Sequence, residues 1–141
     1  MKSNSGFTLI ELIITMSIIV VIAAVSVPGI FAYQKKQNEE RVVLSFVNLY
    51  RNYQQLALSK DSTMKIQISS TNNFINFCDS SKCETLTTST GLFGQDIIFN
   101  IDKYGNILNQ ALSPISSDLT FSSDNYIITI NKYGGITKKA K

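Results

Sequence analysis

The stretch GFTLIELIIT, residues 6–15, carries one acid, Glu11, at the head of a long apolar run. The run continues without a charged residue from Leu12 to Tyr33. At a rise of about 1.5 Å per residue, a helix of that length crosses a hydrocarbon core of about 30 Å. An acid costs roughly 2.5–3.5 kcal/mol at the centre of such a segment and less near its end. The stretch therefore predicts a membrane-spanning helix and leaves the acid in need of an explanation.

Composition restricts the chemistry available to the rest of the chain. The 141 residues suit one small domain plus one additional element, and the net charge of +3 is too small to indicate nucleic-acid binding by itself. The chain has two Cys and no His. A Cys/His zinc site and the Ser-His and Cys-His catalytic arrangements are therefore excluded. We expect neither a cofactor nor a metal.

Two ordinary interpretations of the apolar run are a signal anchor and a cleaved secretory signal. Residues 24–26, Ala-Val-Ser, offer a small-residue cleavage site, and Lys2 supplies a weak basic start. Neither interpretation gives Glu11 a role, so a third is needed.

The leader 1–6 followed by Phe7-Thr8-Leu9-Ile10-Glu11 resembles the processing site of type IV pilins and type II secretion pseudopilins. The resemblance extends through the apolar helix, residues 7–33, as far as Pro28. It implies that prepilin peptidase cuts between Gly6 and Phe7 and that the new Phe7 amine is methylated. It also implies that Thr8 and Glu11 serve assembly. Glu11 would pair with the Phe7 amine of its own chain or of a neighbour, and pairing makes a charge tolerable in apolar surroundings.

The resemblance further implies a location and partners. The protein would cross the bacterial inner membrane once, with its N-terminus cytoplasmic and its C-terminal domain outside, and then enter a filament in the periplasm or at the cell surface. Its partners would be other pilin or pseudopilin subunits, the prepilin peptidase/methyltransferase and the inner membrane. Charge counting does not favour this orientation, because Lys35, Lys36 and Arg41 lie beyond the apolar run.

Residues 34–61 predict an amphipathic continuation of the helix. Pro28 removes one backbone hydrogen bond, so we expect a kink there, as in pilins; the alternative is that the membrane helix ends at Pro28 and a loop follows. Apolar residues then recur at helical spacing, which predicts packing against a sheet. They are Val42/Val43, Phe46, Leu49/Tyr50, Tyr53 and Leu56/Ala57.

Residues 62–141 predict a β-rich domain. Met64, Ile66 and Ile68 alternate with polar residues and indicate a strand, and residues 74–78 suit its return strand. Residues 96–107, DIIFNIDKYGNI, align without gaps to residues 125–136, NYIITINKYGGI, which predicts two similar hairpins. Their glycines, Gly105 and Gly134, supply positive φ at the turns. Residues 119–121 offer another short strand. The expected fold is α+β and pilin-like, a long N-terminal helix packed on an antiparallel sheet of hairpins.

This layout is similar to the GspH/FimT branch of minor pseudopilins and minor pilins. Some FimT-like proteins bind DNA through a Gly-Arg-x-Arg turn, but here the comparable residues 134–139 contain no arginine. Lys138, Lys139 and Lys141 could contact phosphates nonspecifically, or they form a solvated basic tail. Cys78 and Cys83 should form a disulfide if the domain lies outside the membrane; two free thiols are the alternative.

Three functions compete. The first is a structural, non-enzymatic pilin-like subunit, a minor pseudopilin assembled into a type II secretion pseudopilus or a type IV pilus. The second is a DNA-binding minor pilin of a competence system. The third is an anchored enzyme using Asp96, Asp102 or Asp118. Those acids lie at strand starts and turns, where Asp is common for backbone reasons.

Overall fold

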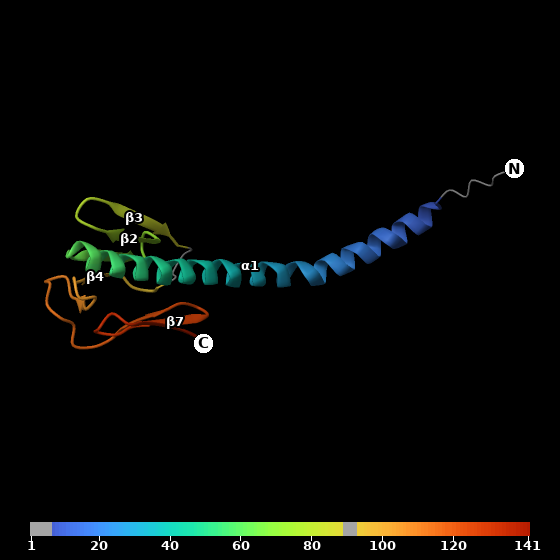
Figure 1. Cartoon of the computed structure of the whole chain (residues 1–141). Helices are drawn as coiled ribbons and strands as arrows, with labels where there is room; N and C mark the ends of the chain where they lie inside the picture. The colour runs from blue at the N-terminus through green and yellow to red at the C-terminus, as the bar shows by residue number, and fades with distance from the viewer. Residues whose placement is uncertain (1–6, 89–92) are drawn as a thin grey trace. The chain divides into compact units, whose positions relative to one another are not determined.

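In the part of the chain that the structure describes, the long helix α1 (Leu9–Lys60) precedes all the strands (Figure 1). The structure is a computed structural model that describes residues 7–88 and 93–141. The chain divides into two compact units, with the boundary between Gln37 and Asn38. The first unit holds the apolar part of α1, and the second combines the rest of α1 with all the strands.

The second part of α1 presents a stripe of buried side chains to the strands. Its members are spaced three or four residues apart, as one face of a helix requires. They are Val43, Phe46, Tyr50, Tyr53 and Ala57. The predicted amphipathic stripe is confirmed, and its neighbours Val42, Leu49 and Leu56 pack partly buried against the same core.

Within residues 7–88 and 93–141, eight strands form two antiparallel sheets in place of the one sheet expected. The five-stranded sheet has the order β3-β2-β1-β4-β5, and the three-stranded sheet has the order β6-β7-β8. The strands are β1 (Met64–Ser69), β2 (Phe74–Cys78), β3 (Cys83–Thr87), β4 (Ile97–Ile101), β5 (Ile107–Leu108), β6 (Leu119–Ser122), β7 (Tyr126–Ile130) and β8 (Ile136–Ala140). Because β5 is only two residues long, it offers little edge for a further strand, and the chain leaves the first sheet before β6 begins.

Aromatic rings from both sheets meet around Phe46 of α1. The ring centroid of Phe46 lies 5.8 Å from that of Phe77, 5.3 Å from that of Phe93 and 6.2 Å from that of Phe121. The predicted alternation of β1 is confirmed, since Met64, Ile66 and Ile68 are all buried. One face of each sheet therefore shares a single core with the helix.

The internal repeat forms the two hairpins that the sequence predicts, β4–β5 and β7–β8. In each turn an Asx side chain accepts two backbone N–H groups: Asp102 from Tyr104 and Asn106, and Asn131 from Tyr133 and Gly135. Such local acceptors favour tight turns.

The glycine of each turn has the predicted positive φ, +85° at Gly105 and +81° at Gly134. The two turns lie against each other, because a Cβ on Gly134 would stand 1.9 Å from the carbonyl oxygen of Gly105. The amide nitrogen of Gln54 donates to both glycine carbonyls at 3.2 Å. One helical side chain thus joins both copies of the repeat.

Candidate processing and assembly segment

Thr8 caps the N-terminus of α1. Its hydroxyl oxygen accepts the backbone N–H of Glu11 at 3.3 Å, and its carbonyl accepts that of Leu12 at 3.2 Å. Thr8-Leu9-Ile10-Glu11 therefore has the Ser/Thr-x-x-Glu spacing of a capping box, with Glu11 in the first turn. A carboxylate there also interacts favourably with the helix dipole. Glu11 thus has a local reason for its position in addition to any partner outside the chain.

The apolar part of α1 exposes its side chains, and an 18-residue window within α1 is unburied and has a mean hydropathy of 2.6. Ile10, Ile19 and Phe31 are all exposed. The helix is long and apolar enough to cross a membrane. The hydroxyls of Thr15 and Ser17 donate to the carbonyls of Leu12 and Ile13, so these polar groups are satisfied within the helix, as a lipid environment requires.

Three further predicted residues belong to this segment: Gly6, Phe7 and Pro28. Gly6 lies outside the described residues, and Phe7 is exposed just before the helix. α1 continues as helix through position 28, so no loop follows Pro28. The kink at Pro28 stays a prediction.

Comparison with known proteins identifies this segment. Residues 1–27 match the family described as the prokaryotic N-terminal methylation motif. The chain is also 39% identical over 56 residues to the type IV wide pilus major component PilA4 of Thermus thermophilus. This N-terminal part of the chain is type IV pilin-like. The match covers 40% of this chain and 42% of that relative's length. No solved structure matched the chain.

The two cysteines close a β-hairpin next to the C-terminal end of α1. Cys78 and Cys83 form a disulfide across β2 and β3. Within the hairpin turn, the Asp79 carboxylate forms an ion pair with the Lys60 ammonium at 2.7 Å. This ion pair, together with backbone N–H groups of Ser81 and Lys82, holds the pKa of Asp79 well below its usual range. The turn is therefore attached to the last residue of the helix.

Two of the three C-terminal lysines have partners within the chain. Lys138 lies 3.3 Å from a Glu40 carboxylate oxygen and 4.4 Å from the Tyr126 ring centroid. Lys141 donates to the carbonyl of Ser123. Lys139 is exposed on β8. These contacts give the basic C-terminus a structural role.

The three acids considered for catalysis each accept hydrogen bonds from backbone N–H groups. Asp96 accepts N–H groups from Ser70 and Thr71, Asp102 organises its turn, and Asp118 accepts the N–H of Lys132. In the described residues, no group of three or more His, Cys, Asp or Glu side chains is placed to hold a metal ion.

Two polar residues of the helix were missed by the sequence interpretation. Glu39 is buried and accepts both the backbone and the side-chain N–H groups of Asn125. Burial opposes its ionisation, but hydrogen bonds from Ser123 and Asn125 outweigh burial and lower the pKa of Glu39. Its position in the sequence could have indicated burial, since Glu39 lies four residues before Val43 on the apolar stripe. Gln54, the residue that bridges the two turns, gave no comparable signal.

Proposed function

We propose that this protein is a structural pilin-like subunit that prepilin peptidase processes at Gly6–Phe7 and that then assembles from the inner membrane into a filament. The observation that supports this most is the continuity of α1. The helix begins at the matched motif, exposes an apolar membrane-length part, and then supplies the core stripe of the β-rich unit. Removal of residues 1–6 would leave that whole helix in place.

The mature N-terminus tests this proposal. Mass spectrometry of the protein purified from its own host should find a chain that begins at N-methylated Phe7. A retained Met1, or a start after the Ala24-Val25-Ser26 site, would refute processing as a pilin.

Within this function we propose that the cytoplasmic N-terminus and the Phe7 amine set the register of assembly. Cleavage places a positive amine one helical turn from Glu11. The cap from Thr8 holds the Glu11 backbone at the start of α1, and the exposed Glu11 carboxylate stays available to an amine. A membrane-impermeant, cysteine-reactive reagent added outside intact cells should not label the Ser3→Cys variant of the unprocessed protein. Labelling under these conditions would contradict this topology.

We also propose the GspH/FimT-like minor subclass, with type II secretion or a type IV pilus as the machine served. The β1–β2 hairpin, which starts four residues after α1 ends at Lys60, supports it. Quantitative mass spectrometry of purified filaments should then find this subunit at a small fraction of the main subunit. Abundance equal to the main subunit would instead identify it as a major pilin.

DNA binding in a competence system is the second candidate, supported by the exposed lysines of β8. The internal partners of Lys138 and Lys141 weigh against it. A mobility-shift assay with the full chain in detergent, at low salt, should compare wild type with the triple variant Lys138→Ala, Lys139→Ala and Lys141→Ala. A shift by wild type that the variant loses would support DNA binding, and no shift by wild type would exclude it.

A further inference from the structure

Strand β3 is an outer edge of the five-stranded sheet, and in the described residues no strand pairs with its far side. Two backbone hydrogen bonds, from the N–H of Asp79 to Lys82 and from the N–H of Thr88 to Asn73, show which residues of β3 bond to β2. By the alternation of an antiparallel ladder, the backbone N–H and C=O groups of Glu84 and Leu86 face β2, and those of Thr85 and Thr87 point outward. No Lys or Pro within β3 blocks pairing with another strand.

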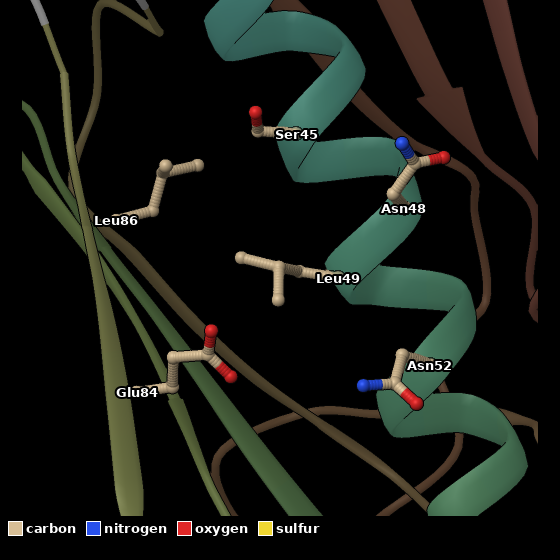
Figure 2. A pocket seen from close by; sticks show the side chains of 6 residues that line it. All are labelled: Ser45, Asn48, Leu49, Asn52, Glu84 and Leu86. Atoms are coloured by element: carbon tan, nitrogen blue, oxygen red, sulfur yellow. The ribbon is translucent and has the colours of Figure 1, made fainter.

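A groove lies between β3 and α1, beside this edge (Figure 2). It has a volume of about 510 Å³. Glu84 and Leu86 point from β3 towards the helix, and Leu49 and Asn52 point from the helix towards β3. The groove therefore presents one exposed carboxylate among small polar and apolar groups.

Strand β8 is an outer edge of the second sheet, and its last four residues are exposed. Two backbone hydrogen bonds, from the N–H of Asn131 to Gly135 and from the N–H of Lys141 to Asn125, show which residues of β8 bond to β7. The backbone N–H and C=O groups of Thr137 and Lys139 face β7. Those of Lys138 therefore point outward, as those of Thr85 do on β3.

We propose that β8 of one copy adds in antiparallel orientation to β3 of the next copy, with Lys138 opposite Thr85. This proposal rests on the proposed function, because it names the surfaces through which subunits meet. In this register all five residues of each strand are paired, and the outward backbone groups of the two strands face each other. Lys139 lies directly opposite Glu84, on the same side of the joined sheet, and Thr137 lies opposite Leu86. A cross-strand ion pair of this kind stabilises an antiparallel pair.

Charge also disfavours the symmetric alternatives. With all five residues paired, two antiparallel β8 edges would set Lys138 opposite Lys138, and two β3 edges would set each Glu84 opposite Leu86 without a cationic partner. The one unfavourable contact in the proposed register joins Lys82 and Lys141, which both lie beyond the strand ends. A contact between two different edges is heterologous, and repeating it produces an open, filament-like chain of subunits.

Photo-crosslinking of the full chain in its host membrane tests the contact. A photoreactive amino acid at position 85 should yield dimers and higher ladders, with the crosslink mapped by mass spectrometry to residues 136–140 of another copy. The matched control is position 120 on β6, also an exposed threonine on an edge strand. Crosslinking at 85 that is no stronger than at 120, or that maps outside β8, would overturn the proposal.

Charge exchange provides the second test. Glu84→Lys alone and Lys139→Glu alone should each reduce the position-85 crosslink at least about threefold, and the double variant should restore it. Loss that the double variant does not restore would overturn the ion pair and its register. If Phe7 is processed and filaments form while both tests fail, only this inference falls. If Phe7 is unprocessed, the proposed function falls with it.

Discussion

Glu39 shows how one side chain can attach two distant parts of the chain. It sits at the polar end of the helical stripe, is 4% exposed, and binds the β6–β7 turn through Asn125. Buried carboxylates are tolerated when their oxygens accept hydrogen bonds, and those bonds lower the pKa of Glu39 here. The neighbouring Glu40 forms a partly exposed pair with Lys138.

We therefore expect Glu39→Gln to lower the free energy of unfolding by about 1–3 kcal/mol at pH 7. Because the folded pKa lies below the ordinary value of 4.5, this stabilisation is complete above that value. It should be lost as the pH falls through the folded pKa. Urea titration of the full chain in detergent, followed by near-ultraviolet circular dichroism of its tyrosines, measures the difference.

The control for Glu39 is Glu40→Gln, which should cost less than about 1 kcal/mol because that pair is exposed to solvent. Equal losses at both positions would contradict a special role for Glu39. A difference between wild type and Glu39→Gln that grows below pH 4.5 would contradict the direction of its pKa shift.

At the scale of elements, the repeated hairpins are held by the contact between their turns. Gly134 needs both its positive φ and the absence of a side chain, because the Gly105 carbonyl occupies the space where a Cβ would stand. Gly94 has φ +64°, and no atom of the described residues lies within 4 Å of where its Cβ would stand. Alanine substitutions at the two glycines therefore distinguish the free-energy cost of the positive φ from the cost of the steric clash.

Gly134→Ala should therefore lower the free energy of unfolding by roughly 2–4 kcal/mol, combining strain with separation of the turns. Gly94→Ala should cost only about 1 kcal/mol, for φ alone. The same urea titration compares them. Equal effects would mean that the two turns do not need to touch.

The β2–β3 hairpin is stabilised by its disulfide and by the Lys60–Asp79 ion pair. The loop that the disulfide closes is short, so the entropic contribution is modest, about 2 kcal/mol. We expect the double variant Cys78→Ser and Cys83→Ser to lose about that much, with α1 still folded by far-ultraviolet circular dichroism. Unchanged stability after replacement of both cysteines would show that the hairpin does not need the bond.

At the scale of the whole molecule, α1 has an exposed apolar part and a part that packs into the core of the β-rich unit. Up to Gln37 the described helix exposes apolar side chains, and from Asn38 it contributes the core stripe of the β-rich unit. The capping contact at Thr8 and the charge of Glu11 can be separated by substitution, because the cap uses the Glu11 backbone N–H and not its carboxylate.

Glu11→Gln should keep the proposed processing at Phe7 but reduce filament incorporation strongly, because the proposed pair with the Phe7 amine would lose its carboxylate. Thr8→Ala should reduce incorporation less, because it removes a cap worth about 1 kcal/mol and leaves the charge. Incorporation is measured by the fraction of the protein that sediments with sheared filaments. Normal incorporation of Glu11→Gln would contradict the pairing of amine and carboxylate.

Features that depend on neighbours along the chain follow from the amino-acid sequence alone. The motif around Glu11, the apolar run, the stripe from Val43 to Ala57 and the Lys-Tyr-Gly hairpins all follow from local spacing and turn chemistry, and the structure contains the stripe and the hairpins where they were predicted. Strand β3 was missed because its residues are exposed and show no alternation of apolar and polar side chains.

Tertiary packing, by contrast, sets which distant surfaces meet. It divided the hairpins between two sheets, placed the two turns on Gln54, buried Glu39 against Asn125 and gave Lys138 and Lys141 partners within the chain. These contacts join residues far apart in sequence, so no local period encodes them. They form because burial of one shared apolar core brings the helix and both sheets together, and the polar groups at its margin must then find partners in each other.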